Sequence, residues 1–175
     1  GCTTTVNVNI SEPSALSVSI ASQTNVSCNG EADGSVSINA SGGTSPYDYN
    51  IGSGYQSNNT FNGLTAGNYT VTVQDDNGCT ATVGVNITQP NALSAMISST
   101  DDVTCNGGSD GGFTVNVNGG TPNYTFDIGT GTQGSNVFNG LSAGTYNVTV
   151  EDNNGCTAEA TAVIDEPNAI SLSTN

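Results

Sequence analysis

The chain repeats itself with a period of 77 residues and without a gap. Gly1-Cys2-Thr3 returns at residues 78–80 and again at 155–157. About 42 of 77 positions are identical when residues 1–77 are aligned with residues 78–154. A fixed period indicates near-equivalent units, and 77 residues suit a small domain that folds alone. Because the sequence opens and closes inside a copy, we expect a segment of a longer array.

Each copy alternates apolar and polar residues with a period of two, which predicts β-strands with one buried face. The first copy shows this pattern at Val36, Ile38 and Ala40, and the second at Tyr146, Val148 and Val150. No segment has helical periodicity. Turn signals separate the strands, at Asp33-Gly34, Gly42-Gly43, Asn62-Gly63 and Asn77-Gly78. Six or seven short strands per copy predict an all-β protein of tandem immunoglobulin-like antiparallel β-sandwich domains.

A tyrosine follows a glycine-containing bend in both copies. The segments are Leu64-Thr65-Ala66-Gly67-Asn68-Tyr69 and its counterpart from Leu141 to Tyr146. A sandwich keeps its tyrosine corner at such a place, with the hydroxyl bonded back to the preceding loop. The alternative is an ordinary core tyrosine with its hydroxyl at the edge.

Prolines mark the expected domain boundaries. Pro13, Pro90 and Pro167 each follow the last strand of a unit by a few residues, and proline cannot donate to a β-ladder. We therefore predict four segments. Residues 1–10 are the last strand of a preceding repeat, 11–88 the first repeat, 89–165 the second, and 166–175 the first strand of a following repeat. Since almost no linker remains between repeats, we expect a stiff rod.

Composition excludes several classes of partner. The chain has no Lys, Arg or His against 15 Asp and Glu, for a formal charge of −15. No cation is present to neutralise phosphate, so we expect no nucleic-acid partner and no binding to anionic membranes. No apolar run is long enough to insert into a bilayer.

Several motifs together resemble the SprB repeat. They include Val26-Ser27-Cys28, the run from Gly42 to Tyr47, and the run from Asp75 to Thr80. That repeat occurs in tandem in giant cell-surface adhesins of gliding bacteria, exported by type IX secretion. The resemblance implies an extracellular, cell-surface location and an adhesive or filamentous role. The second copy departs from the pattern at Pro122-Asn123-Tyr124, and Trp is missing.

The sequence does not favour an enzyme. Without His or Lys, no general base is poised near neutral pH, and neither a Ser-His-Asp nor a Ser-Lys arrangement can form. Paired carboxylates of the glycosidase kind remain formally open. Candidates such as Asp33 and Asp75 lie in turns on opposite sides of the pattern. We expect no catalytic residues and no cofactor.

Calcium is an alternative for the acidic turns. Hard cations prefer oxygen ligands in tight loops, whereas Asp and Asn also serve hairpin turns for purely local reasons. We favour the turn interpretation and keep calcium as the alternative. The candidate ligands are Asp75, Asp76, Asp101, Asp102, Glu151 and Asp152.

Five cysteines occupy fixed positions in the repeat, which suggests disulfides in an oxidising compartment. Sandwich topology places Cys28 where the chain leaves its domain and Cys79 at the opposite end, about 30 Å away along a strand. A disulfide needs Cα atoms within about 7 Å. We therefore favour an inter-domain Cys28–Cys156 bond, with Cys2, Cys79 and Cys105 paired outside this sequence. The alternative pairs Cys28 with Cys79 and Cys105 with Cys156.

The sequence thus predicts a disulfide-stabilised rod that serves as a stalk or filament segment of an extracellular surface adhesin. Its expected partners are neighbouring repeats of the same polypeptide or filament. The alternative is a ligand-binding adhesive module. Such a module would recognise a glycan or a surface protein through the loops from Gly42 to Tyr47.

Overall fold

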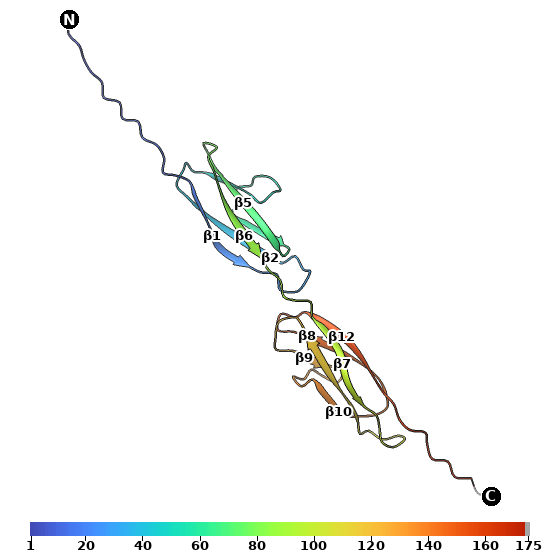
Figure 1. The fold of residues 1–175 in the computed structure, drawn as a ribbon. Coiled ribbons are helices and arrows are strands. Elements are labelled where there is room, and N and C mark those ends of the chain that lie inside the picture. The colour runs from blue at the N-terminus through green and yellow to red at the C-terminus, as the bar shows by residue number, and fades with distance from the viewer. Residues whose placement is uncertain (174–175) are drawn as a thin grey trace. The chain divides into compact units, whose positions relative to one another are not determined.

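The chain forms two compact units built from strands. The structure, a computed structural model, describes residues 1–173, and every regular element in that range is a β-strand (Figure 1). The first unit comprises Gly1–Asn25 and Ala32–Thr88. The second comprises Val26–Glu31 and the chain from Gln89 onward.

Each unit contains six strands. Those of the first are β1 (Ser17–Thr24), β2 (Gly34–Ser41), β3 (Tyr47–Asn50), β4 (Thr60–Leu64), β5 (Gly67–Asp75) and β6 (Thr80–Ile87). Those of the second are β7 (Ser94–Asp101), β8 (Gly111–Asn118), β9 (Thr125–Asp127), β10 (Val137–Leu141), β11 (Gly144–Glu151) and β12 (Thr157–Ile164).

The strands pair into two antiparallel sheets per unit. The first unit has the orders β1-β2-β4 and β3-β5-β6, and the second has β10-β8-β7 and β12-β11-β9. In the second unit one apolar cluster joins residues of both sheets, including Phe113 and Phe138 from one and Val148 and Ile164 from the other. Two sheets packed over a shared core form a β-sandwich, so the predicted fold class is confirmed.

The alternating sequence explains which side chains form this core. In β11, Val148 and Val150 are buried while Asn147 and Thr149 are exposed, because successive strand residues point to opposite faces. The rings of Phe113 and Phe138 stack with centroids 4.9 Å apart. Each fully buried apolar side chain of this size contributes about 1.5–3 kcal/mol.

The tyrosine corner predicted from the sequence is confirmed in both units. The hydroxyl of Tyr146 donates to the carbonyl of Ser142 at 2.9 Å. In the first unit, the hydroxyl of Tyr69 donates to the carbonyl of Thr65 at the same distance. The tyrosine ring therefore fixes the bend that precedes β5 and β11.

One turn signal marks a different feature. Asn62-Gly63 was expected to separate strands, yet it lies inside β4. Gly63 has a φ of 71°, and the pairing of β2 with β4 shifts register opposite it, between Gly34 and Ser35. Glycine with positive φ is typical of a β-bulge, so the signal here produces a bulge within a continuous strand.

The two end segments differ from the sequence prediction. Residues 1–10 form no strand, and Val6, Val8 and Ile10 are exposed. One period later, the equivalent segment is β6, which forms a strand by pairing with β5. The equivalent of β5 for residues 1–10 would lie 77 residues earlier, before Gly1, so these residues have no such partner strand in this structure. Residues 166–173 also form no strand. The remainder of the predicted strand at 166–175 lies outside the described residues.

Candidate functional site

A disulfide within the second unit joins two distant parts of the sequence. The structure bonds Cys28 to Cys156, with Cα atoms 5.7 Å apart and a sequence separation of 128 residues. Cys28 lies in the loop Val26–Glu31, which follows β1 in the sequence but belongs to the second compact unit. Cys156 lies directly before β12, after the turn at residues 152–155. The bond therefore connects residues of two successive sequence repeats.

Hydrogen bonds hold the Cys28 loop against the start of the second repeat. The side-chain amide of Asn29 donates to the carbonyl of Pro90 at 3.0 Å, and the backbone N–H of Gly30 donates to Oε1 of Gln89 at 2.9 Å. The amide of Asn154 donates to the carbonyl of Ser27 at 2.9 Å. Sequence reasoning missed Asn29 and Asn154. The signal was their identity between copies, because Asn29 aligns with Asn106 and Asn154 aligns with Asn77.

The hairpin that carries Cys156 is organised by Asp152, which is 4% exposed. Its carboxylate accepts backbone N–H groups from Thr121 at 2.7 Å, Asn154 at 2.8 Å and Cys156 at 3.0 Å. Burial raises the pKa of the Asp152 carboxyl, but these hydrogen bonds lower it by more, so its pKa lies below the ordinary value. The ionised carboxylate therefore stabilises the turn.

The first unit repeats this arrangement at Asp75. Its carboxylate accepts the backbone N–H groups of Thr44 at 2.9 Å, Asn77 at 3.1 Å and Cys79 at 2.8 Å. The hydrogen bond from Thr44 is the main cause of the lowered pKa of Asp75. Both aspartates thus serve the turns that precede a cysteine.

The other acidic residues considered for calcium are not gathered with these two. Among residues 1–173, no group of three or more Cys, Asp or Glu side chains is placed to hold a metal ion. Asp102 Oδ1 accepts the backbone N–H of Asp165 at 2.9 Å. Asp76, Asp101 and Glu151 are exposed. The arrangement favours turn chemistry, and calcium stays an alternative that chelation can test.

The remaining cysteines are exposed thiols in this structure, namely Cys2, Cys79 and Cys105. The alternative pairings, Cys28 with Cys79 and Cys105 with Cys156, are not formed, because Cys28 and Cys156 are bonded to each other. Pairing of the three thiols outside this sequence stays a prediction.

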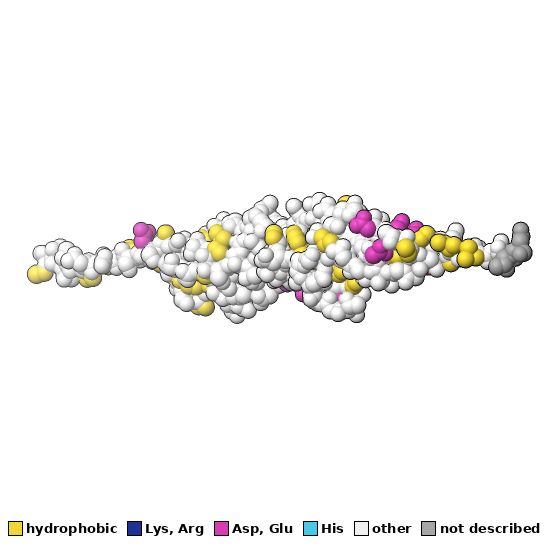
Figure 2. Space-filling view, turned by 90° about the horizontal axis from the view of Figure 1, so that it is seen from below, with side chains coloured by type: hydrophobic (Ala, Val, Ile, Leu, Met, Phe, Trp, Pro, Cys, Tyr) yellow, Lys and Arg dark blue, Asp and Glu magenta, His cyan; other side chains and the backbone are white. Residues whose placement is uncertain are grey.

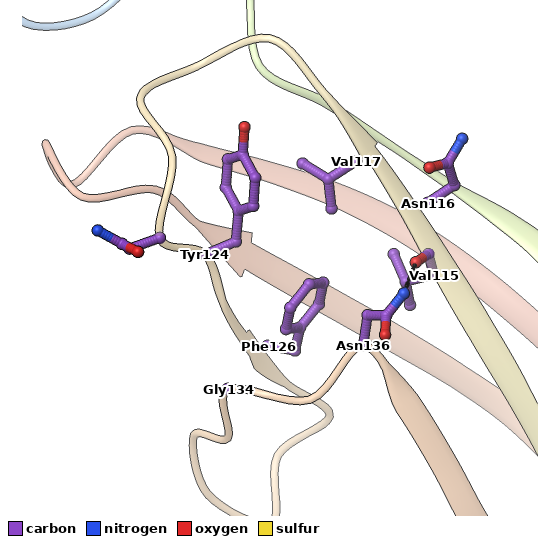
Figure 3. A pocket seen from close by; sticks show the side chains of 8 residues that line it. Val115, Asn116, Val117, Tyr124, Phe126, Gly134 and Asn136 are labelled. Carbon is purple, nitrogen blue, oxygen red and sulfur yellow. Dashed lines mark hydrogen bonds between the residues drawn. The ribbon is translucent and has the colours of Figure 1, made fainter.

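The loop considered for ligand binding is braced by its own hydrogen bonds. Tyr47 donates from its hydroxyl to the carbonyl of Gly42 at 2.6 Å, and its counterpart Tyr124 donates to the carbonyl of Gly119 at 2.8 Å. Beside Tyr124 lies an open cavity of about 580 Å³ (Figure 3). Val115, Val117 and Phe126 line its apolar side, and Asn136 bonds the carbonyl of Val115 at 2.7 Å.

The surface carries acidic side chains but no basic ones, because the chain has no Lys, Arg or His. On the face shown in Figure 2 the acidic groups are few, and uncharged polar side chains and backbone make up most of the surface. The described residues include no helix that could cross a membrane.

The model of the SprB repeat matches the chain twice, over residues 20–54 and 97–133. Each matched segment is similar to the SprB repeat. SprB repeats belong to cell-surface adhesins, and the similarity of both segments is consistent with an extracellular adhesin-type repeat module. Such repeats and immunoglobulin-like folds are typical of non-catalytic structural domains. No curated protein matches the sequence.

Solved structures with a similar arrangement of strands have low sequence identity to this chain. Fibronectin(III)-like modules of Clostridium thermocellum CbhA are 11% identical, with 91% of this chain and 100% of theirs covered and a TM-score of 0.36. A 282-residue C-terminal fragment of intimin, solved with the intimin-binding domain of its receptor, is 15% identical, with 88% and 64% covered and a TM-score of 0.44.

The N-terminal four immunoglobulin domains of Dscam1 isoform 4.44 are 16% identical to this chain. The match covers 89% of this chain and 48% of that structure, with a TM-score of 0.41. This chain therefore spans about half the length of the Dscam1 structure that it matches.

Proposed function

We propose that this chain is a load-bearing stalk or filament segment of an extracellular surface adhesin. The observation that carries the proposal is the Cys28–Cys156 bond, whose ends lie 128 residues apart in successive 77-residue repeats. A bond across a repeat boundary constrains neighbouring repeats, whereas a binding module needs only cross-links within itself. Export by type IX secretion and a role in gliding motility belong to this proposal, and the SprB repeats support it.

The loop hydrogen bonds also support a structural role. The Cys28 loop, the Asp152 turn and the Tyr124 loop are each held by contacts to the chain's own backbone. These hydrogen bonds already restrict the conformations of the loops, so the loops lose little conformational entropy when the chain is placed under load. The polar groups of these loops are hydrogen-bonded within the chain, so fewer of them are left to bind a ligand.

A register-preserving deletion in the full adhesin tests the proposal. Removal of residues 12–165 deletes two whole periods and leaves the repeat frame intact. A stalk segment predicts a shorter filament by electron microscopy with adhesion retained at the cell surface. The matched control removes ten residues fewer, which breaks the frame and should reduce surface display. Loss of adhesion by a displayed, in-frame deletion would contradict the stalk.

The second candidate, a ligand-binding module, rests on the cavity beside Tyr124. We expect a glycan or protein ligand there to be lost when Val117→Glu places a charge on the apolar side. The measurement is binding of the two-repeat chain to a glycan array, with Val163→Glu, at an exposed position in β12, as the control. Binding that depends on Val117 alone would favour this second function.

A further inference from the structure

The second unit has an open cavity at the loop that carries Cys105. Residues 104–106 border it on one side and residues 167–170 on the other, and its volume is about 430 Å³. We call this feature the Cys105 socket. Cys105 itself is an exposed thiol.

The 77-residue period relates the Cys105 socket to the cavity at Cys28, one repeat earlier in the chain. Cys105 corresponds to Cys28 and Ala169 to Ala92. The cavity at Cys28 and Ala92 is bordered in addition by Gly155, Cys156 and Thr157. The equivalent place is therefore bordered by a Gly-Cys-Thr hairpin, and its cysteine is bonded to the cysteine of the loop.

The Cys105 socket already has the internal hydrogen bonds of its occupied counterpart. Asn106 donates from its amide to the carbonyl of Pro167 at 3.1 Å, as Asn29 does to Pro90 at 3.0 Å. The backbone N–H of Gly107 donates to Oε2 of Glu166 at 2.6 Å, as Gly30 does to Gln89. The socket is thus organised before anything occupies it.

One further contact fixes the rim of the socket. Asp110 accepts both the backbone N–H of Thr104 at 3.1 Å and its hydroxyl at 2.5 Å. Thr104 corresponds to Ser27, whose carbonyl accepts the amide of Asn154 from the docked hairpin. The acceptor that a hairpin asparagine would need is therefore held in place by Asp110.

We propose that the Cys105 socket receives the Asn-Gly-Cys-Thr hairpin of a further SprB repeat that follows Pro167 in the same polypeptide. The inference rests on the proposed stalk function and extends it to every junction of the array. Cys105 and the hairpin cysteine then form a disulfide. Two thiols lose two protons and two electrons, and a disulfide oxidoreductase or a small disulfide takes them up as its own dithiol.

The commitment to a repeat in the same polypeptide follows from the residues that lead into the site. Ala92 and Leu93 border the cavity at Cys28, and the chain continues from them directly into the strands of the unit that contains Cys156. Residues 167–170 border the socket in the corresponding way. A hairpin that arrives on a separate chain would have to share this space with them.

A three-repeat chain tests the proposal. Residues 89–165 are appended once more after Asp165, with Cys105→Ser in the appended copy so that only one Cys105 is present. The oxidised protein is treated with iodoacetamide, cleaved at aspartates and analysed by mass spectrometry. In the two-repeat chain Cys105 is alkylated, whereas in the three-repeat chain we expect it to be protected and recovered in a peptide linked to a Cys156 peptide. The matched control carries Cys156→Ser in the appended copy only, and there Cys105 is alkylated again.

Two results would overturn the proposal. One is alkylation of Cys105 in the three-repeat chain while Cys28 stays bonded. The other is an intermolecular Cys105–Cys79 dimer from separate two-repeat chains, which would make a second chain the occupant. Neither result bears on whether the in-frame deletion keeps adhesion, so failure here is distinguishable from failure of the stalk function.

Discussion

Asp152 accepts the backbone N–H of Cys156 at 3.0 Å, so a carboxylate holds the turn that carries the disulfide. The same residue bonds Thr121 and Asn154. One side chain therefore connects the disulfide hairpin to the loop that precedes β9. This coupling makes the junction sensitive to the charge state of Asp152.

Acid should destabilise the second unit through Asp152. Because its folded pKa lies below the unfolded value of about 3.9, its contribution to stability is complete above that value and is lost as pH falls through the folded pKa. We expect the melting temperature to fall below about pH 4 in the parent. Asp152→Asn should be less stable at neutral pH and should show a smaller loss in acid.

The control for that experiment is Asp101→Asn, which makes the same charge change at an exposed site. It should keep the acid dependence of the parent. Equal acid dependence in the parent and in Asp152→Asn, measured by thermal unfolding from pH 2 to pH 7, would disprove the role of the carboxylate.

Gly119 should tolerate no side chain. Its φ is +74°, and an added Cβ would lie 2.0 Å from the carbonyl oxygen of Ala92. We expect Gly119→Ala to cost about 1–3 kcal/mol for overpacking in addition to about 1–2 kcal/mol for the left-handed backbone. Gly129→Ala, at φ +89° in open space, should cost only the backbone part. Similar urea midpoints for the two variants would refute the contact.

The tyrosine corner should be worth one ordinary hydrogen bond. Tyr146→Phe removes the bond to Ser142 and keeps the ring, so a loss of about 0.5–1.5 kcal/mol is expected. Tyr55→Phe, at a tyrosine that is 48% exposed, serves as the control in denaturant unfolding. An unchanged stability of Tyr146→Phe would mean that water replaces the bond at no cost.

Sequence periodicity predicted the strands and the tyrosine corner well because both depend on local residue order. Val148 and Val150 alternate with polar neighbours, and Tyr146 follows its bend directly. The assignment of the Val26–Glu31 loop to the second unit could not be read in this way. It depends on contacts between residues about 60 apart, such as Asn29 with Pro90, and repetition shows similarity rather than contact.

The end segments show the same limit. Val6, Val8 and Ile10 have the alternation of β6, yet they remain exposed, because a strand needs a neighbour as well as a pattern. The acidic turns show it too. The sequence left Asp75 and Asp152 open between calcium and turn chemistry, and only the geometry assigns their oxygens to backbone N–H groups.

Removal of calcium tests that assignment. If the acidic turns need no metal, a chelator should leave the melting temperature unchanged. A specific site filled at 100 times its dissociation constant would add about 2.7 kcal/mol, which for domains of this size is a shift of more than ~10 °C. Calorimetry with and without chelator decides between the two, with added magnesium as the control for ionic strength.

The most direct test of the account is the extension of single chains under force. With Cys28 bonded to Cys156, the segment between them, which spans a sequence separation of 128 residues, cannot extend. At about 3.5 Å per residue, reduction should therefore add about 450 Å to the fully stretched length. The Cys28→Ser variant should reach that length without reductant. If the oxidised parent extends as far as the reduced one, no covalent bond joins successive repeats and the stalk account is wrong.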